Sequence, residues 1–173
     1  MNKREIYQRA QKFCLEHHIE EYPVKIVGLC NECGFEVHAE PLPQDVAGFI
    51  VVQDEPFTKF KTGKVIICNS NDRASRQRFT IAHELAHFVL HRNESQKFFA
   101  HRDVGQRGGI ETEADLFAAQ ILMPADLVFK AFEKLEKELR VVPQSMKARY
   151  IADEFAVSVE AAHIRLEQLG VFC

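Results

Sequence analysis

The chain has 173 residues, of which 46% are hydrophobic and 27% are charged, and its formal net charge is −3 at pH 7. This length suits one domain, or one domain with a small appendage. The slightly negative net charge excludes a general attraction to nucleic acid or to anionic membranes. No apolar run approaches the length of a membrane span, and five cysteines do not suit a disulfide framework. Residues 1–13 mix charges throughout and have no apolar h-region, so secretion is not expected. We therefore expect a cytoplasmic protein.

Two helices are predicted at the start of the chain, at residues 3–18 and 23–33. In the second, Cys30 and Cys33 fall at helical spacing with the preceding apolar residues. No second cysteine pair exists to complete a zinc site with them. Burial in the core is the preferred interpretation.

Strands are predicted next, because residues 35–39 alternate between apolar and polar side chains. Apolar runs separated by turn residues then predict an antiparallel meander of strands at residues 47–53, 57–60 and 64–69. An exposed edge strand of this sheet would suit pairing with an extended substrate. Asn71 or Asp72 is the predicted N-cap of the helix that follows.

Residues 78–91 are predicted to form the helix on which the rest of the chain depends, since they contain His83-Glu84-x-x-His87. Side chains four residues apart share a helical face, so both imidazoles can bind one divalent metal, zinc being the first choice. Glu84 would accept a proton from water and deliver it to a leaving amine, which is the chemistry of amide hydrolysis. A histidine-rich chain can contain this motif by chance, but an imidazole pair within so apolar a helix would be costly without a metal.

A third ligand is expected from a second helix at residues 111–123. Glu111 would bind the metal, and Asp115, one turn later, would accept the far N–H of a ligand histidine and orient its ring. Glu113 is the alternative ligand. It lies on the opposite side of the helix from Glu111, so only one of the two can face the metal.

With these motifs in place, the sequence resembles the ImmA/IrrE family of metallo-endopeptidases. The resemblance rests on residues 78–87, on Leu90-His91 and on residues 111–124, and it covers about residues 20 to 130. It implies a small gluzincin-like domain that cuts bacterial regulatory proteins, often phage-type or stress-response repressors encoded nearby. Ala86 stands where the family usually has Gly.

Residues 93–109 form a long predicted loop between the two metal helices. Phe98, Phe99 and His101 are candidate substrate-side residues of a lid, although a plain mobile loop is the alternative. His91 is a further candidate that would stabilise an oxyanion or bind substrate. It is also suited to capping the end of its helix.

The C-terminal part begins with a predicted helix from Pro124 to about residue 140. Helices at about residues 145–155 and 159–169 then resemble a helix-turn-helix. The second would turn five polar side chains outward: Glu160, His163, Arg165, Glu167 and Gln168. From Gln144 onward the tail has three Lys or Arg against four Asp or Glu, so docking or packing is favoured over DNA binding.

The overall prediction is an α+β protein, in which a small zincin-like domain has an antiparallel sheet packed on the His-Glu-x-x-His helix. This zinc peptidase domain would span residues 1–140, with helix-turn-helix-like helices at 141–173 packed on it. The predicted function is zinc-dependent cleavage of a bacterial regulatory protein, such as a helix-turn-helix repressor or an antitoxin-like partner. The alternative is a non-proteolytic regulatory interaction protein, for example one associated with DNA.

Overall fold

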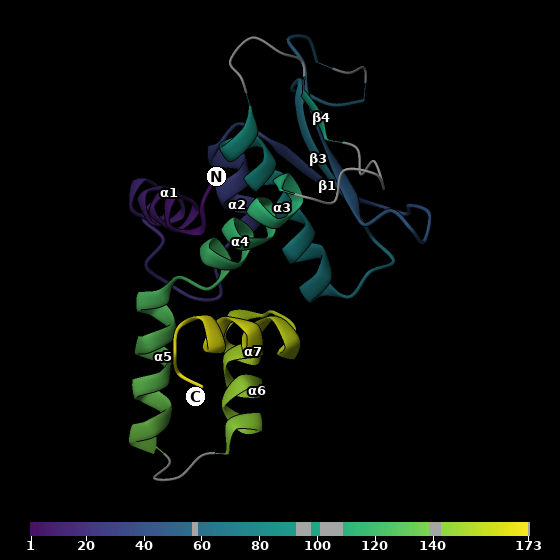
Figure 1. The fold of residues 1–173 in the computed structure, drawn as a ribbon. Coiled ribbons are helices and arrows are strands. Elements are labelled where there is room, and N and C mark those ends of the chain that lie inside the picture. Colours follow the sequence, from purple (N-terminus) through teal and green to yellow (C-terminus); the bar gives the residue numbers. More distant parts are fainter. Residues whose placement is uncertain (57–58, 93–97, 101–108, 139–142, 173) are drawn as a thin grey trace.

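The computed structural model describes residues 1–56, 59–92, 98–100, 109–138 and 143–172, and it confirms the α+β class. Within these residues, one four-stranded sheet lies beside the helices, with α2 and α3 packed against it (Figure 1). A single hydrophobic core cluster draws on the helices and on the sheet. None of the helices in this described part is long and apolar enough to cross a membrane. The helices are α1 (Lys3–Glu16), α2 (Ile26–Glu32), α3 (Ala74–His91), α4 (Ile110–Leu122), α5 (Ala125–Glu138), α6 (Gln144–Phe155) and α7 (Val159–Gln168).

The sheet has the strand order β1-β3-β2-β4, made of β1 (Glu36–Glu40), β2 (Gly48–Val52), β3 (Lys64–Asn69) and β4 (Phe98–Ala100). The predicted strands at residues 47–53 and 64–69 are found as β2 and β3, but they pair directly with each other, antiparallel and without a strand between them, and β4 extends the sheet antiparallel to β2. The pairing of β1 with β3 is parallel, so the sheet is mixed and β3 is buried between two neighbours. The predicted strand at residues 57–60 is wrong where it can be seen, because Lys59 and Phe60 lie in a turn and a bend.

Helix α3 lies between the sheet and α4, as Figure 1 shows. Its residues from Thr80 to His87 are all buried, as expected from the apolar pattern of this helix. Gly48 in β2 allows the sheet to approach α3 closely. A Cβ added at Gly48 would lie 2.5 Å from Thr80 Cγ2 and 2.5 Å from the carbonyl oxygen of Ile67.

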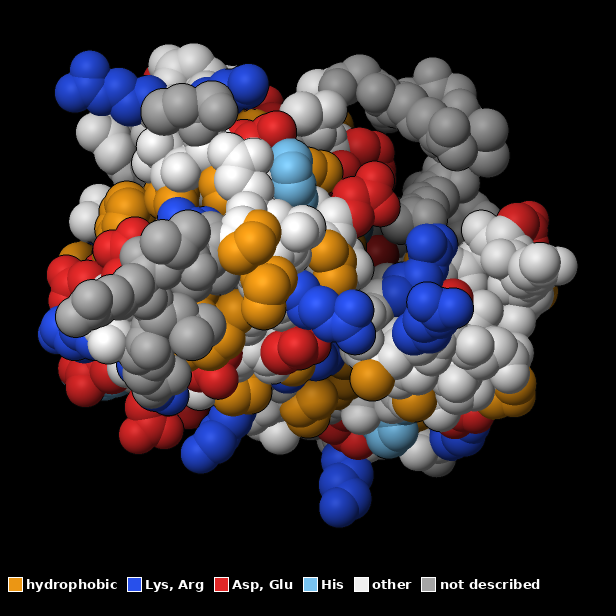
Figure 2. Space-filling view, turned by 90° about the horizontal axis from the view of Figure 1, so that it is seen from below, with side chains coloured by type: hydrophobic (Ala, Val, Ile, Leu, Met, Phe, Trp, Pro, Cys, Tyr) orange, Lys and Arg blue, Asp and Glu red, His pale blue; other side chains and the backbone are white. Residues whose placement is uncertain are grey.

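The C-terminal helices α5, α6 and α7 lie together below α4 in Figure 1. The face seen from below in Figure 2 carries side chains of both charges with hydrophobic side chains between them, and neither charge dominates it. The prediction that Arg165 points outward is wrong, because this residue is only 2% exposed. Its Nε donates to the carbonyl oxygen of Met123 at 3.0 Å and its Nη2 to Gln120 Oε1 at 2.7 Å. The carbonyls at the end of α4 therefore hold this cation inside the protein.

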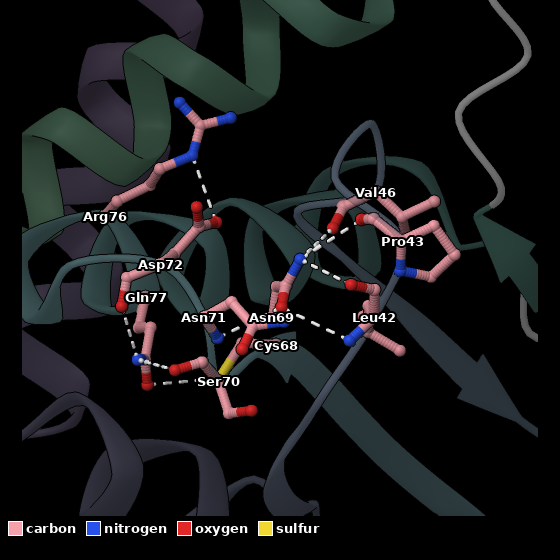
Figure 3. A network of polar contacts seen from close by, with 10 residues as sticks. All are labelled: Leu42, Pro43, Val46, Cys68, Asn69, Ser70, Asn71, Asp72, Arg76 and Gln77. Atoms are coloured by element: carbon pink, nitrogen blue, oxygen red, sulfur yellow. Dashed lines mark hydrogen bonds and ion pairs between the residues drawn. The ribbon is translucent and has the colours of Figure 1, made fainter.

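The start of α3 also departs from expectation, because Arg73 is the N-cap and no side chain caps the helix. The two residues predicted to cap it take part in a neighbouring network instead (Figure 3). Buried Asn69 donates to the carbonyl oxygens of residues 42, 43 and 46 and accepts from the backbone N–H groups of residues 42 and 71. Asp72 accepts from Arg76 Nε at 3.0 Å. Asn69 thus shapes the loop of residues 41–47 beside the start of α3.

Candidate metal centre

Two helices bring three potential metal ligands together. His83 and His87 lie one turn apart on α3, and Glu111 lies in the first turn of α4. One ligand atom from each residue lies within 4.8 Å of the others, and no other such group of His, Cys, Asp or Glu occurs among the described residues. The nitrogen and oxygen donors of this group suit a divalent metal of the zinc type.

The ligand atoms converge on one point. His83 Nε2 and His87 Nε2 are 2.9 Å apart, and each lies 3.2 Å from an oxygen of Glu111. Both imidazoles are buried, whereas a third of the Glu111 side chain is exposed. Glu111 is thus the ligand in contact with solvent, and a catalytic metal site needs a position that water can reach.

Asp115 orients the first histidine from the other side. Its Oδ1 lies 2.8 Å from His83 Nδ1, so the imidazole presents Nε2 to the ligand cluster. Burial disfavours protonation of His83, but the hydrogen bond to Asp115 and the negative charges of Glu84 and Glu111 outweigh burial and raise the pKa of this histidine. The carboxylates around His83 thus favour a positive charge at this position.

Glu113, the alternative ligand, faces away from the cluster. It pairs with the α-amino group of Met1, and its Oε2 lies 3.6 Å from His91 Nε2. Burial lowers the pKa of His91, while Glu113 opposes this shift. His91 and Glu113 therefore form a pair behind His87 and take no part in the three-residue cluster.

The remaining candidates differ in what the structure shows of them. Glu84 is buried next to His83 in α3, with 3% exposure. Phe98 and Phe99 belong to β4, so part of the predicted loop is a strand. His101 and most of the predicted lid lie outside the described residues.

Sequence reasoning gave no role to Arg78, although it ties the metal helix to two other parts of the chain. Its Nε donates to the carbonyl oxygen of Ala156 at 3.1 Å, and its Nη2 donates to that of Val24 at 2.8 Å. Burial lowers the pKa of this guanidinium. No local pattern points to this role, because both acceptors are main-chain atoms distant in sequence.

Comparison with known proteins matches a stretch that includes both helices of the candidate metal centre. The sequence model of a peptidase family, described as the IrrE N-terminal-like domain, matches residues 30–167. The chain is 30% identical over 104 residues to "uncharacterized immunity region protein 2" of Bacillus phage phi105, covering 54% of this chain and 65% of the phage protein.

Two proteins named radiation response metalloprotease IrrE are also similar. The one from Deinococcus deserti is 42% identical over 67 residues, which is 37% of this chain and 24% of the relative. The one from Deinococcus radiodurans is 31% identical over 96 residues, which is 54% of this chain and 29% of the relative. The matches thus span less than two thirds of each relative. Since the family model covers more than half of the chain, the chain belongs to the peptidase family of the IrrE N-terminal-like domain.

Proposed function

We propose that this protein is a zinc-dependent endopeptidase of the bacterial cytoplasm that cuts a regulatory protein. The observation that carries the proposal is the convergence of His83, His87 and Glu111 within 4.8 Å, with Asp115 fixed behind His83. Family membership and the metalloprotease names of two relatives support it. The phage relative, named for an immunity region, supports a regulatory protein as the substrate.

Each residue has a defined task in this proposal. His83, His87 and Glu111 hold the metal, and Asp115 keeps the His83 ring in the tautomer that presents Nε2. A bound divalent metal supplies a Lewis acid that polarises the scissile carbonyl and lowers the pKa of water. Glu84 lies beside the metal position without being part of the ligand cluster, so its carboxylate takes the proton from the attacking water and delivers it to the leaving amine.

The test separates metal binding from hydrolysis. Glu84→Gln is expected to retain one metal ion per chain and to lose cleavage, whereas His83→Ala and Glu111→Ala lose the metal. Glu113→Ala is the matched control for Glu111→Ala, because it removes a neighbouring carboxylate that faces the other way. Elemental analysis of the folded variants measures the metal.

Cleavage is measured by incubating the protein with each regulator encoded beside its gene and reading intact masses. A new pair of fragments that is absent with Glu84→Gln supports the proposal. If Glu84→Gln releases the metal while remaining folded, its proposed role is wrong. If a regulator binds but is not cut by the metal-loaded protein, the alternative of a non-proteolytic interaction protein is favoured.

A further inference from the structure

A groove of about 970 Å³ lies between α3, α4 and α7. Each helix contributes one face to it, and the floor is mostly apolar. The floor consists of Phe79 from α3, Leu116 and Ala119 from α4, and Ala161 and Ile164 from α7. Ile164 is 47% exposed, so the groove presents a large aliphatic side chain to solvent. Covering this side chain with an apolar partner would be favourable.

The two edges of the groove carry opposite charges. On one edge, the start of α3 contributes Arg73 and Arg76; on the other, the first turn of α7 contributes Glu160. Arg76 is already paired with Asp72. Neither Arg73 nor Glu160 forms an ion pair with any residue that the structure describes. A ligand that places an acid near α3 and a base near α7 would therefore be complementary to both edges.

The walls of the groove are held in place by two arginines, of which Arg165 is buried and Arg78 is partly buried. Arg165 attaches α7 to the end of α4 through the carbonyl oxygen of Met123. Arg78 attaches α3 to the turn before α7 through the carbonyl oxygen of Ala156. Because the Arg165 guanidinium is buried and both arginines donate to main-chain carbonyl oxygens, movement of α7 would leave these polar groups unsatisfied. The groove is thus formed before any ligand arrives.

The dimensions suit a short helix. The face that α4 presents runs from Thr112 to Ala119 and that of α7 from Glu160 to Gln168, which corresponds to roughly 10–12 Å at 1.5 Å per residue. A partner helix would lay about two turns in this length. An apolar floor with charged edges is the form that binds amphipathic helices.

We propose that this groove docks an amphipathic helix of the protein that the peptidase cuts, with its apolar stripe on the floor, an acidic residue toward α3 and a basic residue toward α7. This inference rests on the proposed function. The groove does not overlap the ligand cluster, because Asp115 lines the groove and contacts Nδ1 of His83, whereas the cluster lies at Nε2 of the same ring. Docking here leaves the reaction side free and raises the effective concentration of a scissile segment nearby.

The experiment measures binding in the absence of cleavage. Each purified regulator encoded beside the gene is labelled and titrated with the metal-loaded Glu84→Gln chain, with fluorescence anisotropy as the readout. Ile164→Glu in this background is expected to weaken binding by roughly tenfold or more. Val159→Glu is the matched control, because Val159 is 48% exposed on the same helix but does not line the groove. It is expected to leave the dissociation constant unchanged.

A charge variant tests the same surface without touching the apolar floor. Arg73→Glu, at an exposed residue, is expected to weaken binding at low salt and to lose this effect at high salt. In the active protein, Ile164→Glu is expected to slow cleavage of the intact regulator about tenfold, while cleavage of a short peptide spanning the cut site is unchanged. Thermal unfolding of each variant controls for folding.

Each remaining outcome overturns the docking proposal or leaves it supported. Equal effects of Ile164→Glu and Val159→Glu, or no effect of either, overturn it, and so does the failure of every regulator to bind. A change in sedimentation caused by Ile164→Glu alone shows that a second copy of this chain occupies the groove, which also overturns it. Specific binding without cleavage contradicts the proposed function and leaves the docking surface supported.

Discussion

The link between Asp115 and His83 gives a prediction whose size follows from the structure. Asp115→Ala removes the acceptor that holds Nδ1 of His83 at 2.8 Å, so the ring loses both its fixed tautomer and a neighbouring negative charge. Loss of such an outer carboxylate typically weakens metal binding 10- to 100-fold. Because 57% of the Asp115 side chain is exposed, solvent screens its charge, and we expect the lower end, about tenfold or 1.4 kcal/mol.

Asp115→Asn separates the two contributions, since an amide oxygen still accepts the hydrogen bond without carrying the charge. We expect an affinity between those of the native protein and the alanine variant. Competition with a chromogenic chelator at fixed pH measures the metal dissociation constants of the native protein and of the two variants. Asp153→Asn is the control, because it makes the same change in net charge at an exposed position on α6. An unchanged affinity in Asp115→Ala would refute the orienting role and leave the contact as a surface hydrogen bond.

Three further predictions concern pH and stability. Metal affinity is expected to rise with pH until the pH exceeds the raised pKa of His83, because protons compete with the metal for the imidazole. Without metal, the raised pKa stabilises the fold at low pH, and this stabilisation is lost as the pH rises through that pKa. Urea titrations at a series of pH values measure the loss. Gly48→Ala should cost roughly 2 kcal/mol of unfolding free energy. Adding Thr80→Ser to this variant should restore part of the loss, because it removes the methyl group that the new Cβ would meet. Asn69→Ala should cost roughly 3 kcal/mol of unfolding free energy, since five hydrogen bonds between the Asn69 amide and main-chain groups are lost; denaturation that matches the native protein would contradict this.

The helices and three of the strands, β1, β2 and β3, could be predicted because their signals are local. The pattern of α3 indicated a buried helix, and burial from Thr80 to His87 confirms it. The positions of β2 and β3 followed from short apolar runs. The parallel pairing of β1 with β3 could not be predicted, because it joins residues about thirty positions apart and depends on which side of β3 pairs with β2.

The errors arose where tertiary contacts override local preference. Asn69 and Asp72 show this at the start of α3, since a buried amide organises the preceding loop and the predicted cap binds Arg76 instead. Arg165 shows it in α7, where a charged side chain is buried against carbonyl groups contributed by α4. Sequence spacing placed this residue on a polar helix face, but it carries no information about which neighbouring helix covers that face.

One helix connects the metal centre to the proposed docking groove. The C-terminal half of α3 carries His83 and His87, whereas its N-terminal half contributes Arg76 and Phe79 to the groove wall and Arg78 to the attachment of the C-terminal helices. Because the sheet packs closely on α3, this helix cannot shift without disturbing that contact. A partner seated in the groove would therefore be held at a fixed position relative to the ligand cluster. Selectivity for one protein would then depend on a rigid distance between docking and chemistry, without a deep pocket around the scissile bond.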